Sequence, residues 1–189
     1  MHTLNGIDTI RYFDIDTHAM EKFADNLNKY NLNLIPCDSI ATACQNADIV
    51  TTATAAKKRA NLLHANHIQP GTFINAIGGD CPGKTELDPA LIQQAKVVIE
   101  YQPQTAIEGE IQNADHTNTT ELYRIILGET NPRTHQDDII IFDSVGIAIE
   151  DFSALRFLNT LCDTHEEIGF GSLLPQPQDP KNLFAELDN

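Results

Sequence analysis

Short apolar runs alternate with longer stretches of helical periodicity over the first hundred residues. Runs typical of β-strands cover residues 9–14, 32–36, 48–54, 71–79 and 95–101. Apolar spacing typical of helices covers residues 15–30, 39–47, 62–68 and 88–95, and Ser39 is placed to cap the second of these. Because the strands look apolar on both sides, the pattern predicts a parallel sheet with helices on both faces, the Rossmann-type α/β class.

The pattern loosens after residue 101. An amphipathic helix is predicted over residues 117–129, an apolar strand over 137–146 and a long helix over 149–169. The tail over residues 173–184 is rich in proline, which predicts an extended segment on the surface.

Composition narrows the function classes. The chain has 189 residues, enough for one globular domain, and its 41% apolar content predicts a packed core. The 12 Lys and Arg against 27 Asp and Glu give a net charge of −15, which argues against nucleic acid or an anionic membrane as partner. Four widely spaced cysteines, no apolar stretch of membrane-spanning length and no signal-peptide pattern predict a cytoplasmic chain with free thiols.

Asp14 closes the first predicted strand. An acidic residue at the end of the second Rossmann strand binds the adenosine ribose, about 20 residues after a glycine-rich phosphate loop. Asp is also a common turn residue, so Asp14 equally fits an ordinary strand end. The chain contains no GxGxxG motif. The sequence therefore predicts an incomplete fold that lacks the first strand and the phosphate loop, with two unpaired strand edges where that strand would lie.

The loop Asn75-Ala-Ile-Gly-Gly-Asp-Cys-Pro-Gly-Lys-Thr-Glu86 carries the strongest chemical pattern. It follows an apolar strand and precedes a helix, so it lies at the carboxyl end of the sheet, where α/β folds bind ligands. Gly78 and Gly79 would let the backbone approach a flat ring, beside which Asp80 could accept a proton and Lys84 adds a cation. The plainer alternative is a strand-to-helix loop in which Asp80 caps the helix and Pro82 begins it.

This loop, with residues 100–112 and 142–157, resembles the ornithine cyclodeaminase and mu-crystallin family, and its DCPGKTE string resembles the cyclodeaminase branch most. The resemblance runs from about residue 7 to the tail. It implies an NAD cofactor, a homodimer for the complete chain and a substrate pocket built largely by a preceding segment. It also implies two parts: a partial NAD-binding domain over residues 1–150, and a C-terminal helix and tail over 151–189 that pack back on it or on an N-terminal domain.

The same resemblance assigns roles residue by residue. Asp80 would be the catalytic proton donor and acceptor, Asp14 would bind the adenosine ribose and Val145 would touch the substrate. Further contacts with NAD are assigned to Ala53, Thr54, Ala76, Ile77, Gly78, Gly79, Lys84 and Ser144. Buried strand positions explain Ala53, Ala76 and Ile77 as well, and Ser144 also fits an ordinary turn.

The implied reaction is conversion of L-ornithine to L-proline and ammonia, with hydride recycled through NAD. An NAD(P)-dependent imine reductase or amino-acid dehydrogenase of the same family is the alternative, and an inactive fragment is a third. Asp14 favours NAD over NADP, because a carboxylate repels a 2′-phosphate. Ornithine, lysine and related diamines are not separated by these residues.

Several other polar residues receive plainer interpretations. Glu100, Glu108 and Glu110 could be paired acid/base carboxylates, but we expect them at solvated loop and strand-end positions. Cys81, beside Asp80, could be a reactive thiol, but we expect a small packing residue. His64 and His67 lie three residues apart on a predicted helix, but no third ligand follows, so no metal site is expected.

Overall fold

The computed structural model describes residues 6–55, 59–114 and 119–164. The chain divides into two compact units, unit 1 (residues 1–37 and 149–189) and unit 2 (residues 38–148). The described elements of unit 1 are β1 (Thr9–Tyr12), α2 (Thr17–Leu27), β2 (Asn33–Pro36) and α7 (Ala148–Thr164), the last beginning one residue before the division. Those of unit 2 are α3 (Ile40–Cys44), β3 (Ile49–Thr52), β4 (Arg59–Leu63), η1 (Ala65–His67), β5 (Phe73–Ala76), β6 (Thr85–Leu87), α4 (Pro89–Gln94), β7 (Lys96–Ile99), α5 (Gln102–Glu108), η2 (Glu110–Asn113), β8 (Thr119–Glu121), α6 (Leu122–Ile126) and β9 (Ile140–Asp143).

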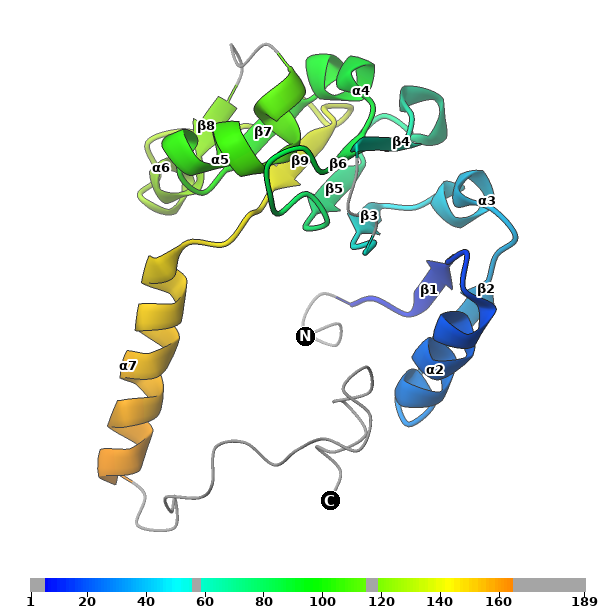
Figure 1. Ribbon diagram of the computed structural model, residues 1–189, viewed down its shortest axis with the longest axis horizontal. Coiled ribbons are helices and arrows are strands. Elements are labelled where there is room, and N and C mark those ends of the chain that lie inside the picture. The colour runs from blue at the N-terminus through cyan, green and yellow to red at the C-terminus, as the bar shows by residue number, and fades with distance from the viewer. Residues whose placement is uncertain (1–5, 56–58, 115–118, 165–189) are drawn as a thin grey trace. The chain divides into compact units, whose positions relative to one another are not determined.

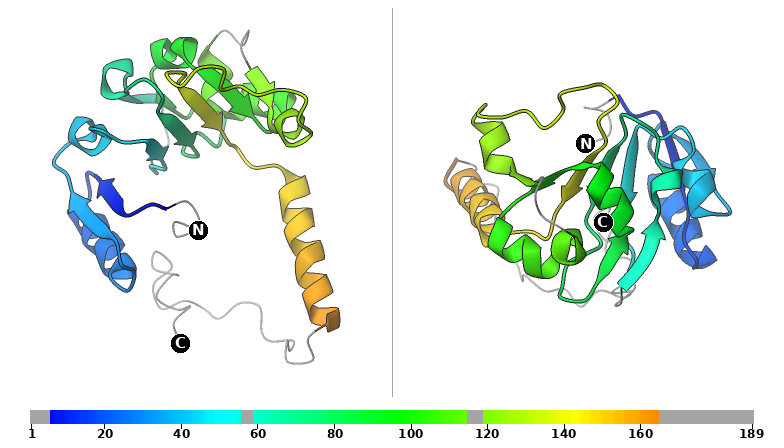
Figure 2. Two further views of the ribbon diagram at one scale, coloured as in Figure 1. Left: turned by 180° about the vertical axis from the view of Figure 1, so that it is seen from behind. Right: turned by 90° about the horizontal axis from the view of Figure 1, so that it is seen from above.

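Unit 2 is built on a parallel sheet with the strand order β3-β5-β9-β7-β8 (Figure 1). Thr52, Ala76 and Asp143 lie in register at the carboxyl ends of three neighbouring strands. Strands β4 and β6 form a separate, short parallel pair in the same unit (Figure 2). The predicted α/β class with a parallel sheet is therefore confirmed, and its carboxyl edge gathers the loops that carry the candidate chemistry.

One face of this sheet is covered by a buried apolar core. Ile74, Ile141 and Val97 lie side by side on β5, β9 and β7, and each is at most 3% exposed. They pack with residues from the helices and from the small strand pair, namely Cys44, Leu63, Leu87, Leu91, Ile92 and Ile111. On the other face Ile140 and Val98 are 4% exposed, whereas Phe73, Asn75 and Phe142 are only half-buried. Because side chains alternate along a strand, the two faces of the sheet differ in their cover.

Side-chain caps fix the helix starts in unit 2. The Ser39 hydroxyl accepts a hydrogen bond from the Thr42 amide at 3.2 Å, so the predicted cap is confirmed. The Asp88 carboxylate accepts a bond from the Ala90 amide at 2.9 Å, and Pro89 occupies the first turn of α4. Each cap satisfies an amide that the helix itself leaves unpaired.

In unit 1, β1 and β2 form a parallel pair connected by α2. The Tyr12 and Phe23 rings pack at 4.8 Å between centroids, which joins the strand to the helix. Among the described residues, β1 pairs with β2 and β3 pairs with β5, and no ladder joins β1 to β3.

The predicted helix over residues 62–68 is wrong. This segment contains the end of β4 and the short turn η1, and Leu63 pairs with Leu87 of β6. Leu63 is 1% exposed, so the apolar spacing that imitates a helix belongs to a buried strand end. Its partner β6 was not predicted, because its three residues lie inside a loop-like string.

The later elements differ from their predictions mainly in length. The helix predicted over residues 117–129 is confined to α6, and β8 precedes it. Helix α5 was not predicted, and its first turn contains Pro103. The long C-terminal helix is confirmed as α7, whereas residues 165–169 and the predicted extended tail lie outside the described residues.

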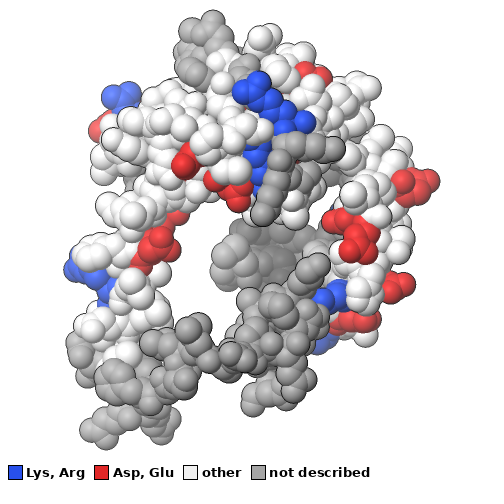
Figure 3. Space-filling model, in the orientation of Figure 1, with Lys and Arg blue, Asp and Glu red and all other residues white. Residues whose placement is uncertain are grey.

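No helix in the described part of the chain is both long enough and apolar enough to cross a membrane. On the face of unit 2 drawn in the upper part of Figure 3, the described Lys and Arg side chains stand in separate groups.

Candidate active site

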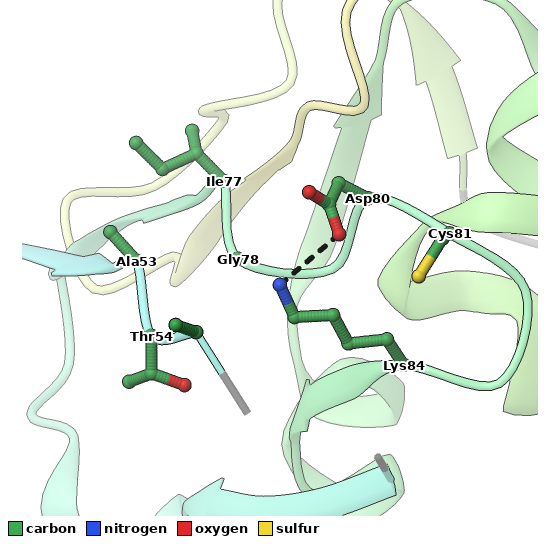
Figure 4. Close-up of a pocket in the computed structure, with 8 residues that line it drawn as sticks. Ala53, Thr54, Ile77, Gly78, Asp80, Cys81 and Lys84 are labelled. Carbon is green, nitrogen blue, oxygen red and sulfur yellow. Dashed lines mark hydrogen bonds and ion pairs between the residues drawn. The ribbon is translucent and has the colours of Figure 1, made fainter. Parts of the chain in front are cut away.

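A pocket of about 580 Å³ opens at the carboxyl ends of β3 and β5 (Figure 4). Two adjacent loops line it, with Ala53, Thr54, Ala55, Ile77, Gly78, Asp80, Cys81 and Lys84. Six of these residues were assigned from the sequence; Ala55 was not, and Cys81 had been given a packing role. Two further assigned residues, Ala76 and Gly79, are buried and do not line the pocket.

Asp80 and Lys84 form the polar end of the pocket. The Lys84 ammonium lies 3.1 Å from an Asp80 carboxylate oxygen, as the dashed line in Figure 4 marks. The Lys84 side chain is 9% exposed, whereas that of Asp80 is 58% exposed. A buried ammonium group is costly unless it is paired, so Lys84 holds the carboxylate in one place while leaving much of it accessible.

The loop between Gly78 and Lys84 is fastened by Gln112 from η2. The Gln112 side-chain oxygen accepts a bond from the Gly83 amide at 2.7 Å, and its amide group donates to the Lys84 carbonyl at 3.0 Å. Gly83 has a φ of +83°, which favours glycine at this turn. A side chain 28 residues away thus sets the path of the loop.

The two glycines before Asp80 also have a structural reason, while their predicted approach to a flat ring stays a prediction. A Cβ atom on Gly78 would overlap the Glu86 carboxylate, and one on Gly79 would lie 2.7 Å from a Glu110 oxygen. Glu86 in turn accepts hydrogen bonds from the amide and the hydroxyl of Thr54. Glycine is therefore required here by buried carboxylates behind the pocket wall.

Ser144 and Val145 follow β9 at the same edge of the sheet but do not line the pocket. The Ser144 amide donates to the Ala76 carbonyl at 3.0 Å. The Glu100 carboxylate accepts bonds from the Ser144 hydroxyl at 2.6 Å and from the Val145 amide at 3.0 Å. Their assigned contacts with cofactor and substrate stay predictions.

Asp14 lies in unit 1, after β1. Its carboxylate accepts a bond from the Asp16 amide at 2.8 Å, which is the turn chemistry that the plainer interpretation expects. Its assigned contact with the adenosine ribose stays a prediction.

The solvated positions expected for Glu100 and Glu110 are wrong. Glu100 is 7% exposed and Glu110 is 1% exposed, and each carboxylate binds backbone amides. Glu108 is half-buried in α5 and accepts a bond from Gln104 at 3.0 Å. The local sequence does not predict the burial of these acids, because the backbone amides that offset the cost of desolvation are distant in sequence.

Burial shifts the titration of two of these acids. Desolvation raises the pKa of Glu110 to about 7, and the nearby Asp143 and Glu86 charges act in the same direction. Desolvation also raises the pKa of Asp143 to about 6, with a further contribution from the Glu100 charge. Glu110 and Asp143 therefore bind protons more tightly than exposed carboxylates do.

Cys81 and the two histidines, His64 and His67, can also be compared with what the sequence predicted for them. Cys81 is exposed and lines the pocket, so its predicted packing role is wrong. His64 lies 2.9 Å from Asp88, and desolvation lowers the pKa of His67. In the part of the chain that the structure describes, no group of three or more His, Cys, Asp or Glu side chains is arranged to hold a metal ion.

A parallel sheet with a pocket at its carboxyl edge is the arrangement in which open α/β proteins bind their ligands. Residues 1–164 match the ornithine cyclodeaminase/mu-crystallin family, and the chain belongs to this family. An ornithine cyclodeaminase of Agrobacterium tumefaciens strain Ach5 is 44% identical over 183 residues, which cover 96% of this chain and 51% of that relative. The chain thus spans about half the length of the curated relatives it matches.

Solved structures of enzymes share the fold. An archaeal alanine dehydrogenase dimer with bound NAD has a TM-score of 0.77 at 26% identity, over 91% of this chain and 54% of that one. A lysine cyclodeaminase, in a structure on recognition of L-lysine, L-ornithine and L-2,4-diaminobutyric acid, also has a TM-score of 0.77 at 26% identity, over 91% and 50% of the two chains.

Proposed function

We propose that the protein containing this chain is an NAD-dependent ornithine cyclodeaminase, which converts L-ornithine to L-proline and ammonia. The observation that carries the proposal is the Asp80–Lys84 pair, 3.1 Å apart, in a pocket at the carboxyl edge of a parallel sheet. The 44% identity to an enzyme named ornithine cyclodeaminase supports it. A homodimer and a cytoplasmic location belong to the same proposal.

The pocket residues fit the nicotinamide half of NAD. Ala53 and Ile77 offer an apolar wall to a flat ring, and Ile77 is 44% exposed toward solvent. Asp80 and Lys84 offer an acceptor and a donor at the rim of that wall. When bound, NAD would take a hydride from the substrate α-carbon and return it after ring closure, so the reaction has no net oxidation.

Asp80 is the residue suited to the proton transfers. Its carboxylate is accessible, and the Lys84 ammonium fixes its orientation. In the proposed reaction it accepts a proton from the substrate α-amine and returns one as ammonia leaves, while the δ-amine closes the ring.

The second candidate is an imine reductase or amino-acid dehydrogenase. The structural likeness to an alanine dehydrogenase favours it. Product analysis of the complete protein with L-ornithine separates the two: a cyclodeaminase forms proline and ammonia in equal amounts at constant NADH absorbance. A steady change in NADH in proportion to product would contradict the cyclodeaminase proposal. L-lysine is tested in parallel, because the chain also resembles a lysine cyclodeaminase.

The role of Asp80 is tested with Asp80→Asn in the complete protein. The amide keeps the shape of the side chain but cannot accept the proton, so we expect turnover to fall by about 10²–10⁴-fold while NAD binding persists. Asp137→Asn, an exposed acid elsewhere in unit 2, is the matched control and should leave turnover unchanged. An Asp80→Asn rate within about threefold of the parent would remove Asp80 from the mechanism.

A further inference from the structure

Three buried carboxylates form a layer behind the pocket, each seated against a glycine. Glu86 and Asp143 are 0% exposed and Glu110 is 1% exposed. Glu86 fills the space beside Gly78, Glu110 that beside Gly79, and Asp143 that beside Gly109, where an added Cβ would lie 2.6 Å from its oxygen.

Each acid in this layer binds the backbone of the next. Asp143, at the end of β9, accepts bonds from the Glu110 and Ile111 amides at 2.9 and 3.0 Å. Glu110 accepts bonds from the Glu86 and Leu87 amides, both at 2.9 Å. The series therefore runs from the centre of the sheet through η2 to β6.

Glu86 ends the series at the pocket wall. One of its oxygens accepts bonds from the Thr54 amide, at 3.0 Å, and from the Thr54 hydroxyl. Its other oxygen, Oε2, is buried without a hydrogen-bond partner among the described residues. A buried carboxylate with one oxygen unpaired costs free energy, so fold stability alone would favour an apolar residue of similar volume.

We infer that Glu86 is a positioning residue: it holds Thr54 and the backbone at Gly78 in a fixed relation, and so sets the distance between the pocket wall and Asp80. Both Thr54 and Gly78 line the pocket, and Asp80 is two residues beyond Gly78. This inference rests on the proposed function only in treating the pocket as the place where the reaction occurs. The positioning itself rests on the contacts of Glu86.

Residue-resolved amide hydrogen exchange on residues 1–189, without NAD or substrate, tests this role. Glu86→Met keeps the volume and removes both acceptors, so we expect exchange at Thr54 to accelerate by about tenfold to a hundredfold, and by more than at the core amides of β5 and β9. Glu86→Gln retains an acceptor for Thr54 and should stay within about threefold of the parent. A residue that served only the stability of the fold would accelerate exchange at Thr54 and at the core amides alike.

Thiol labelling gives a second readout in the same samples. Cys81 lies in the loop next to Asp80 and is exposed, so its labelling rate reports the conformation of that loop. Cys162 on α7 is exposed in unit 1 and serves as the internal reference. Glu86→Met should change the Cys81 rate and leave the Cys162 rate unchanged, as peptide mass spectrometry can show.

Leu91→Ala is the matched control for lost stability, because Leu91 is 0% exposed in α4 and does not line the pocket. It should lower the stability of unit 2 as a whole, without a particular effect on amide exchange at Thr54 or on thiol labelling at Cys81. If Glu86→Met does not fold, Thr54→Val removes only the hydroxyl and should accelerate exchange around Gly78 in the same direction.

Parent-like values at Thr54 and Cys81 in Glu86→Met would overturn the inference, and so would changes equal to those of Leu91→Ala. Parent-like exchange in Thr54→Val would overturn it where Glu86→Met cannot be measured. Since no step here needs catalysis, failure of this inference and failure of proline formation are separate results.

Discussion

Unit 2 and the described part of unit 1 differ in how they are held together. Every buried side chain among the described residues lies between Cys44 and Asp143, hence in unit 2. Helix α2 of unit 1 has no buried residue, and Phe152 and Leu155 on α7 are more than half exposed. Asp80 therefore has a packed core beneath it, whereas Asp14 is placed by local turn and strand contacts. Asp14 and Asp80 are thus held in place by different kinds of stabilisation.

The largest expected effect concerns NAD binding by residues 1–189 alone. Asp14 and Asp80 lie in different units, and no ladder joins β1 to β3 in the described residues. Residues 1–189 contain no GxGxxG motif, the loop whose backbone amides bind the pyrophosphate of NAD, and the loss of those contacts reduces affinity. We expect a dissociation constant near or above millimolar, about −4 kcal/mol, instead of low micromolar, about −8 kcal/mol.

Isothermal titration measures this constant. Adding, as a separate chain, the part of an ornithine cyclodeaminase that this chain does not match should restore binding. Low micromolar binding by residues 1–189 alone would show that these residues contain a sufficient NAD site. The expectation of weak binding would then be wrong.

A pair of matched isoleucines sharpens the comparison of stability. Ile141 on β9 is 0% exposed, whereas Ile10 on β1 is half-buried. We expect Ile141→Ala to lower the free energy of unfolding by about 2–5 kcal/mol, and Ile10→Ala by about 1 kcal/mol or less. Urea unfolding followed by circular dichroism gives both values. Equal losses would mean that unit 1 packs as tightly as unit 2.

The acids behind the pocket predict an unusual pH dependence. The pKa of Glu110 is raised in the folded chain to about 7, mainly by desolvation, so the folded state binds its proton more tightly than the unfolded state. Its contribution to stability is therefore complete below about pH 4.5 and is lost as pH rises to about 7, a change of about 3 kcal/mol at about 1.4 kcal/mol per pKa unit.

Urea unfolding of the parent and of Glu110→Gln between pH 5 and 8 isolates this contribution, because groups common to both chains cancel. The pKa of Asp143, raised by desolvation to about 6, adds a smaller change of the same sign to both. A parent and variant with parallel pH profiles would assign the dependence to other groups.

The smallest expected effect concerns Asp14. Asp14→Asn keeps an acceptor for the Asp16 amide but removes the charge that would repel a 2′-phosphate. In the complete protein we expect the preference for NAD over NADP to fall by about tenfold, or about 1.4 kcal/mol. Competition binding with both cofactors measures it. An unchanged preference would leave Asp14 with its turn contact alone.

Elements with a strong local pattern could be predicted from the sequence. The strands at residues 9–14, 71–79 and 95–101 have apolar runs bounded by turn residues, and each contains an observed strand. Strands β4 and β6 could not be predicted, because their pairing is a contact between distant segments and one has three residues. Proline at the second residue of α5 begins a helix here, although it also reads as a loop signal.

The same distinction between local patterns and contacts of distant segments applies to the candidate site. The loop that carries Asp80 and Lys84 was visible because its residue types stand together in the sequence. The acids that hold it were not visible: Glu86 acts on Thr54 across 32 positions, and Glu110 acts on Glu86 across 24. Burial of a carboxylate depends on which amides the fold brings to it, and sequence spacing does not reveal them.

The glycine–carboxylate pairs also constrain how this chain can diverge. Alanine at position 78 would collide with the side chain of Glu86, and a shorter residue at position 86 would leave a gap beside Gly78. Each single step is unfavourable, but the two changes together restore the fit. Positions 78 and 86 are therefore expected to vary in step among descendants of this chain.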